Sequence, residues 1–212
     1  MNRYANRIKN GSFVLDGVRY NTTLNENGLD TLHGGNPGYD RSAFTLGSLS
    51  GSNVSFTLHD PAGNQGFPHA VDSLVSYALL ENATLAIRMN ASASGGRTPI
   101  MLSSHVYWQL EGYNASEGRS ILDHVFHLPV AQRYIATDSI LIPTGEVPDV
   151  KGTAYDFRSP KTFRSLFNDT EGVCGAGCQG WDSCFVLDEH AREEPVVSLA
   201  SYLSPFFAAA SH

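Results

Sequence analysis

The sequence predicts an all-β protein. Glycine is abundant, with 20 of 212 residues, while segments of helix-favouring composition are scarce and several short segments alternate apolar and polar side chains. Apolar residues make up 42% of the chain and charged residues 17%, which allows a substantial core and argues against disorder. Because about ten strands are separated by turn signals, a sandwich or a barrel is favoured. No repeat or linker interrupts the chain, so we expect one domain over residues 1–212.

The predicted strands follow one another along the chain. Residues 13–15 and 18–20 flank Asp16-Gly17, a dipeptide typical of a two-residue hairpin turn. Residues 53–59 alternate strictly between apolar and polar side chains and stop at a proline-containing turn. The other predicted strands span residues 71–80, 84–89, 105–110, 121–128, 139–142, 184–187 and 196–203, and one short helix is predicted over residues 161–167.

The charge balance and hydropathy exclude two classes of partner. Lysine and arginine together number 14 against 21 aspartates and glutamates, giving a net charge of −7. A surface that follows a phosphate backbone needs the opposite balance, so nucleic acid is not an expected partner. No apolar run approaches the roughly 20 residues of a membrane-spanning helix. We therefore expect neither a nucleic-acid partner nor a membrane partner.

Asparagine-x-serine/threonine triplets are unusually frequent. An excess of these acceptor triplets favours a glycoprotein that passes through a eukaryotic secretory route, whereas the alternative is a chain that is simply rich in Asn, Ser and Thr loops. No signal peptide starts at Met1, so we expect the natural N-terminal segment to be missing from this chain. The seven acceptor asparagines are Asn10, Asn21, Asn53, Asn82, Asn90, Asn114 and Asn168.

Three cysteines lie within one short segment. A zinc site is one alternative, but the spacing lacks a second pair of ligands. A disulfide between Cys174 and Cys178 is favoured because the intervening Gly-Ala-Gly can turn tightly, and it agrees with secretion. Cys184, flanked by Phe185, is then expected to be a buried free thiol.

A few polar residues are candidates for ligand contacts. His33 precedes two glycines, which let backbone approach a ligand closely, and His105 begins a predicted strand. Asp182 follows a tryptophan, and Arg7 follows Asn6. Each has a structural alternative: strand-end histidines often only satisfy hydrogen bonds, and Arg7 could pair with a surface carboxylate.

Taken together and in order, the segments that contain these residues resemble the aldose 1-epimerase, or mutarotase, family, and especially its secreted fungal branch. The resemblance covers roughly residues 2 to 204. Each motif alone is weak, but the ordered series is specific. The matching segments are Arg3-Tyr4-Ala5-Asn6-Arg7-Ile8, Asn10-Gly11-Ser12-Phe13, Leu32-His33-Gly34-Gly35, Gln65-Gly66-Phe67-Pro68, Ser104-His105-Val106-Tyr107-Trp108, Pro143-Thr144-Gly145-Glu146, Gly152-Thr153-Ala154-Tyr155-Asp156-Phe157 and Gly180-Trp181-Asp182.

The resemblance implies a fold and a chemistry. The fold would be a large antiparallel β-sandwich of the galactose mutarotase type, incomplete in this chain. Asn6, Arg7 and His33 would bind the ring oxygen and hydroxyls of a monosaccharide, and Asp182 would hold its hydroxyls. His105 would be the general acid that protonates the ring oxygen when α and β anomers of an aldohexose such as glucose or galactose interconvert. The reaction needs no metal and no organic cofactor.

One departure from the family pattern concerns the catalytic base. In the family this is a glutamate well beyond the position of Asp182, and no residue of this chain matches it, so the chain is expected to be truncated at both ends. Two hypotheses follow: an aldose 1-epimerase, or a non-catalytic carbohydrate-binding remnant without the base. A hexose-phosphate epimerase is disfavoured by the acidic charge and the glycosylation triplets.

Overall fold

The computed structural model describes residues 3–110, 120–191, 194–201 and 207–211. Within these residues the regular structure consists of β-strands and short 3-10 turns, with no α-helix, which confirms the all-β prediction. The contacts divide the chain into two compact units, unit 1 of residues 1–106 and unit 2 of residues 107–212. Each unit is described by itself below, and the expected single domain stays a prediction.

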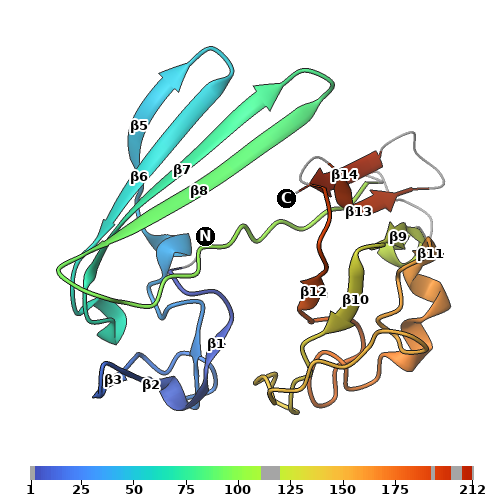
Figure 1. Cartoon of the computed structure of the whole chain (residues 1–212), viewed down its shortest axis with the longest axis horizontal. Helices are drawn as coiled ribbons and strands as arrows, with labels where there is room; N and C mark the ends of the chain where they lie inside the picture. Colours follow the sequence, from blue (N-terminus) through green and yellow to red (C-terminus); the bar gives the residue numbers. More distant parts are fainter. Residues whose placement is uncertain (1–2, 111–119, 192–193, 202–206, 212) are drawn as a thin grey trace. The chain divides into compact units, whose positions relative to one another are not determined.

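The main element of unit 1 is a four-stranded antiparallel sheet in the order β5-β6-β7-β8, in which strands consecutive in the sequence are neighbours (Figure 1). Three of its strands were predicted from the sequence, although β8 continues five residues beyond the predicted end at Met89. The strands are β5 (Thr45–Ser50), β6 (Asn53–Asp60), β7 (Ala70–Leu80) and β8 (Thr84–Ser94).

The two faces of this sheet differ in character. The register aligns Phe56, Val75 and Met89 across β6, β7 and β8, so these apolar side chains share one face. The opposite face contains His59 and Asp72, whose exposed side chains lie 2.7 Å apart between Nδ1 and Oδ1. The period-two pattern of the sequence therefore produces a sheet with one apolar face and one polar face.

Smaller strand pairs of unit 1 carry the N-terminal motifs. Strand β1 (Arg7–Ile8) pairs with β4 (Thr31–Leu32), and β2 (Ser12–Leu15) pairs with β3 (Val18–Asn21). The β2–β3 turn has φ of 51° at Asp16 and 79° at Gly17, as the predicted two-residue hairpin requires. The 3-10 turns of this unit are η1 (Lys9–Gly11), η2 (Tyr39–Arg41) and η3 (Asn64–Gly66).

A buried charge network holds the N-terminal segment against the sheet. Arg3 and Asp60 form an ion pair in which both side chains are 2% exposed, and the Arg3 guanidinium lies 4.6 Å from the centre of the Phe67 ring. The Tyr39 hydroxyl donates to Asp60 Oδ2 at 3.1 Å, and burial together with this carboxylate raises the pKa of Tyr39 to about 12. These contacts fix the backbone that leads directly into Asn6 and Arg7.

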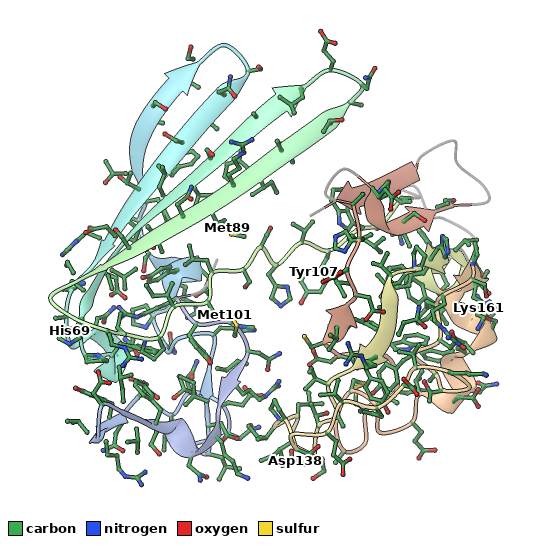
Figure 2. All side chains as sticks on the ribbon, viewed as in Figure 1. His69, Met89, Met101, Tyr107, Asp138 and Lys161 are labelled. Atoms are coloured by element: carbon green, nitrogen blue, oxygen red, sulfur yellow. A yellow bond between two sulfur atoms is a disulfide. The ribbon has the colours of Figure 1, made fainter. Side chains whose placement is uncertain are left out.

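The segment after β8 pairs with the same N-terminal residues. Ala5 N donates to Met101 O at 2.9 Å, and Met101 N donates to Arg3 O at 2.9 Å; Met101 is labelled in Figure 2. The segment then continues to His105. The backbone of unit 1 therefore ties the start of the chain to the segment that carries the predicted acid.

Unit 2 contains two small antiparallel sheets around an aromatic core. The first pairs β10 with β12, and the second has the order β11-β9-β13-β14. Leu128, Ala131 and Phe157 form the buried centre, and Phe126 and Trp181 pack against it. The strands are β9 (Val125–His127), β10 (Ala131–Tyr134), β11 (Lys161–Thr162), β12 (Phe185–Leu187), β13 (Pro195–Ala200) and β14 (Phe207–Ser211); the 3-10 turns are η4 (Ile121–Asp123), η5 (Phe163–Ser165) and η6 (Phe167–Asp169).

Several sequence predictions for secondary structure were wrong. Residues 105–110 are not in a strand, and the helix predicted over 161–167 is β11 followed by 3-10 turns. The strand predicted over 121–128 begins as a 3-10 turn and is extended only at Val125–His127. Residues 139–142 form a turn because Asp138 Oδ1 accepts from the backbone N–H of Ile140 and of Ile142, both at 3.0 Å. The short apolar segments at residues 105–110 and 139–142 were therefore predicted as strands but do not pair with another described strand.

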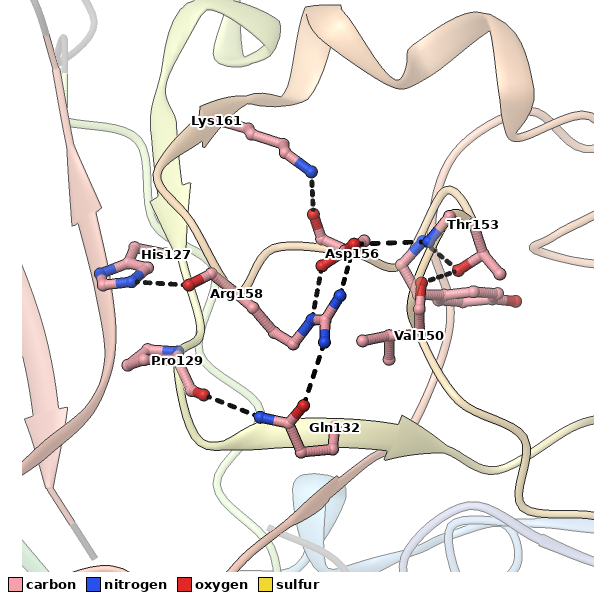
Figure 3. Close-up of polar contacts among 10 residues, drawn as sticks. His127, Pro129, Gln132, Val150, Thr153, Asp156, Arg158 and Lys161 are labelled. Atoms are coloured by element: carbon pink, nitrogen blue, oxygen red, sulfur yellow. Dashed lines mark hydrogen bonds and ion pairs between the residues drawn. The ribbon is translucent and has the colours of Figure 1, made fainter.

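A polar cluster fixes the loop that enters the core of unit 2. Arg158 donates to both carboxylate oxygens of Asp156 at 2.8 Å, and its Nη1 donates to Gln132 Oε1 at 3.1 Å (Figure 3). Lys161 Nζ donates to the backbone oxygen of Asp156 at 2.6 Å. The Arg158 guanidinium holds the pKa of Asp156 well below its usual range. The loop before Phe157 is therefore held by charge-assisted hydrogen bonds.

The cysteines lie in unit 2. Cys174 and Cys178 form a disulfide, with their Cα atoms 5.4 Å apart across the Gly-Ala-Gly turn. Cys184 is a free thiol. It is exposed, so the expectation of a buried Cys184 was wrong. The residue lies just before the first residue of β12 and outside the core.

Candidate functional site

The pairing of β1 with β4 places Asn6 beside His33. His33 N donates to Asn6 O at 2.9 Å, and Asn6 N donates to His33 Nδ1 at 3.2 Å. Both residues have left-handed backbone, with φ of 59° at Asn6 and 54° at His33. Asparagine and histidine adopt this conformation more readily than most residues, and strained backbone of this kind is concentrated at functional sites. These two contacts hold the His33 ring beside the backbone of Asn6.

Arg7 lies next to this pair and is largely buried, with 9% of its side chain exposed. Its Nη1 donates to Asn6 Oδ1 at 3.0 Å, and its Nη2 donates to Glu26 Oε1 at 3.1 Å. Its Nε is buried and has no hydrogen-bond partner among the residues that the structure describes. Arg7 therefore pairs with a carboxylate, as its structural alternative expected, although its own side chain is largely buried and its Nε is left without a partner in the described part of the protein.

Glu26 is the residue of this cluster that sequence reasoning missed. It lies 19 positions from Arg7 along the chain, in a loop without a recognisable motif. In the sequence, an acidic residue between two asparagines indicates only an ordinary turn. Only the backbone path, which returns through β4, brings its carboxylate to the guanidinium.

His105 completes the cluster in unit 1. Its ring lies edge-on to that of His33, with 5.5 Å between ring centres and 82° between ring planes. His105 is exposed to solvent, as a group that exchanges protons with a ligand must be. It also lines a cavity of about 530 Å³ over the apolar sheet face, together with Phe56, Val75 and Met89. The structure thus brings together Asn6, Arg7, His33 and His105.

The two glycines after His33 allow close packing within the protein. A side chain at Gly34 would approach Arg3 and Tyr4, and one at Gly35 would collide with Gln65. Gln65 Oε1 accepts from Asn36 N at 3.1 Å and fixes this turn. The backbone at these glycines is closely approached, as expected, but by other residues of the protein and not by a ligand. This packing holds His33 in place.

Asp182 belongs to unit 2 and is exposed there. The preceding Trp181 donates from Nε1 to Ala154 O at 2.9 Å, and its ring packs on Phe157 and Phe163 with centre distances of 5.6 and 5.3 Å. Because Trp181 is anchored in the core, Asp182 follows at a fixed point on the surface of its unit.

Two other histidines have structural roles. His124 is 1% exposed and its Nε2 accepts from Leu110 N at 3.1 Å, while His127 Nε2 interacts with Arg158 O at 3.2 Å. In the described part of the chain, no group of three or more His, Cys, Asp or Glu side chains is arranged to hold a metal ion. None of the helical turns described here has the length and apolar character of a membrane span.

The asparagine triplets lie mainly on unit 1. Asn53 and Asn90 lie on the polar face of the large sheet, opposite Ala78 and Leu74 respectively. Asn114 lies outside the described residues. The acceptor asparagines that the structure does describe are all exposed: Asn10, Asn21, Asn53, Asn82, Asn90 and Asn168.

Comparison with known proteins gives consistent relatives. A probable aldose 1-epimerase of Arthroderma benhamiae is 40% identical over 200 residues, which cover 88% of this chain and 44% of the relative. The galactose mutarotase of Bos taurus is 39% identical over 74% of this chain and 44% of its own length. The aldose 1-epimerase of Haemophilus influenzae is 33% identical over 94% of this chain and 56% of its own length. The chain spans about half the length of these relatives.

Solved structures show the same fold. An aldose epimerase homologue from C. elegans matches with a TM-score of 0.82 at 25% identity, over 98% of this chain and 59% of that one. A galactose 1-epimerase from Lactobacillus acidophilus matches with a TM-score of 0.78 at 24% identity, over 94% of this chain and 56% of its own. The expected galactose mutarotase type of fold is thereby confirmed.

The family model described as aldose 1-epimerase matches residues 1–202. This match includes every residue that the sequence nominated for the site, and the N-terminal four of them lie together in unit 1. The chain belongs to the aldose 1-epimerase family.

Proposed function

We propose that this protein is an aldose 1-epimerase that interconverts the α and β anomers of an aldohexose such as glucose or galactose. The contact between His33 and His105 carries the proposal. His105 is the exposed member of the pair, whereas His33 is partly buried and hydrogen-bonded to Asn6. From its exposure and its motif, we assign the proton donor of the reaction to His105.

The reaction follows from these assignments. His105 gives its proton to the ring oxygen while a base removes the proton of the anomeric hydroxyl, and the bond between C1 and the ring oxygen breaks to give the open-chain aldehyde. Rotation about the C1–C2 bond and closure by the reverse transfers yield either anomer. Arg7 and His33 are assigned to sugar oxygens, and Asp182 to sugar hydroxyls, from their motifs. No residue is assigned as the base.

A binding-only function is the second candidate, because the hydrogen-bonded cluster of Asn6, Arg7 and His33 can hold a sugar without any proton transfer. A positioned proton-transfer group contributes about 10²–10⁴-fold in rate. A chain that lacks the base would therefore bind an aldose but catalyse little mutarotation. The two candidates therefore differ in turnover and not in affinity.

Polarimetry on freshly dissolved α-glucose, with sugar binding measured by titration calorimetry, tests both candidates. The enzyme function predicts mutarotation above the buffer rate, with His105→Asn reducing turnover about a hundredfold or more and changing saturation little. His33→Asn should mainly weaken binding, because it removes a ground-state contact. Binding without any rate above buffer would favour the second candidate, and a His105→Asn variant at full speed would refute the acid assignment.

We also propose that the protein is a secreted glycoprotein. Exposure of the acceptor asparagines among the described residues supports this, since a glycan must reach solvent. Expression in a secreting eukaryotic host followed by enzymatic deglycosylation should lower the apparent mass. Peptide mapping that finds every one of the seven asparagines unmodified would contradict the proposal.

A further inference from the structure

Arg7 is a buried cation whose charge must be offset. Its side chain is 9% exposed, and an isolated charge at that depth is costly. Among the described residues, the acidic group that pairs with it is Glu26, at 3.1 Å between Nη2 and Oε1. Asn6 Oδ1 accepts from the other terminal nitrogen at 3.0 Å. Two of the three nitrogens are therefore engaged by protein, while the buried Nε has no partner there.

The loop that carries Glu26 is fixed at both ends. The Asn25 side chain donates to Leu32 O at 2.9 Å and accepts from Leu32 N at 2.7 Å, so it is joined to β4. Glu26 N donates to Asp30 O at 3.1 Å, and Asp30 Oδ1 accepts from Asn10 N at 2.7 Å. The Glu26 carboxylate, 27% exposed, is thus presented to Arg7 with little conformational freedom left to lose.

We propose that Glu26 is a positioning and charge-matching residue of the sugar site. It fixes the Arg7 guanidinium through the contact between Nη2 and Oε1, and it offsets the positive charge, so that the site accepts an uncharged aldose in preference to a sugar phosphate. An anionic ligand would gain attraction from Arg7 but face the Glu26 carboxylate as well. This inference rests on the proposed function, in which Arg7 contacts the sugar.

Glu26→Gln removes the charge at nearly constant size. A phosphate about 8–10 Å from the carboxylate, at an effective dielectric constant of about 20–30, should then gain about tenfold in affinity. Binding of the uncharged sugar should weaken, because a neutral amide holds the guanidinium less firmly than the carboxylate of an ion pair does. We therefore expect the affinity ratio of glucose 6-phosphate to glucose to rise about tenfold or more. Glu26→Asp keeps the charge and should retain most of the original preference.

The experiment measures Kd for glucose and for glucose 6-phosphate with the full 212-residue chain and its variants. Asp16→Asn is the matched control, because Asp16 is paired with Arg97 at 2.6 Å on the exposed hairpin of the same unit. Its positive φ of 51° suits asparagine. The control removes the same unit of charge from the protein and should leave both affinities unchanged. An unchanged affinity ratio in Glu26→Gln, with glucose still bound, would overturn the inference and leave the proposed function intact.

A second measurement does not depend on sugar binding. Urea unfolding of Arg7→Met, Glu26→Gln and the double variant should be non-additive, with the double variant more stable than the sum of the single changes predicts. Additive effects would mean that the two groups do not interact and would overturn the inference. If the single changes are coupled but the wild-type chain binds neither sugar, both the ligand-selecting role and the proposed function are refuted.

Discussion

Replacement of Asp60 by asparagine should destabilise unit 1 more than any exposed charge change. Asp60 is 2% exposed, pairs with the equally buried Arg3, and accepts from the Tyr39 hydroxyl at 3.1 Å and from Asn64 Nδ2 at 2.6 Å. An asparagine oxygen can still accept from Tyr39 or Asn64, but it does not compensate the Arg3 charge. Leaving one partner of a buried ion pair uncompensated typically costs about 3–5 kcal/mol. That is a large share of the 5–15 kcal/mol that stabilise an ordinary domain.

Hydrogen exchange by mass spectrometry is the suitable assay. Both tryptophans, Trp108 and Trp181, lie outside unit 1, so tryptophan fluorescence reports on unit 2. Peptides from β6 and β7 should lose protection in Asp60→Asn, while peptides from β9 and β13 should change little. The double change Arg3→Met, Asp60→Leu should recover most of the lost stability, because it removes both buried charges.

The control is Asp123→Asn, which breaks the exposed pair with Arg164 in unit 2 and should cause no measurable change. The reasoning about Asp60 fails if Asp60→Asn leaves protection of β6 and β7 at the wild-type level. It also fails if the double change is as unstable as the sum of the two single changes, because burial of an unpaired charge would then not be the cause.

Three further outcomes follow from the structure. Because the pKa of Asp156 is depressed in the folded protein, its pairing with Arg158 stabilises the fold fully above the unfolded pKa of about 3.9. This stabilisation is lost as pH falls towards the pKa of folded Asp156, so Asp156→Asn should flatten the plot of unfolding free energy against pH below about pH 4. An unaltered plot would disprove this. Because the pKa of Tyr39 is raised from 10.0 to about 12, its contribution is lost as pH rises through that interval, and Tyr39→Phe should remove this part of the alkaline slope measured by denaturant titration. In protein from a secreting host, the unreduced peptide containing Cys174 and Cys178 should be lighter by two hydrogens, with Cys184 open to alkylation; finding all three thiols free would contradict the disulfide.

The sequence determined the elements whose information is local. Alternating side chains mark β6 because neighbouring residues in a strand point to opposite faces, and Asp16-Gly17 marks the hairpin because that turn needs positive φ at both positions. The same alternation over residues 105–110 did not produce a strand, since a strand also needs a hydrogen-bonding partner. A pattern shows which face a strand would present but does not supply the partner.

The same distinction between local information and tertiary contacts applies to the candidate site. Ordered motifs nominated Asn6, Arg7, His33 and His105, and the structure gathers these four in unit 1. The tertiary structure alone decided that Arg7 is buried against Glu26, and that Arg3 is paired with a residue 57 positions away. The physical reason is that burial and ion pairing depend on which distant segments the folded backbone brings within a few ångströms, and the spacing of residues along a chain does not contain that distance.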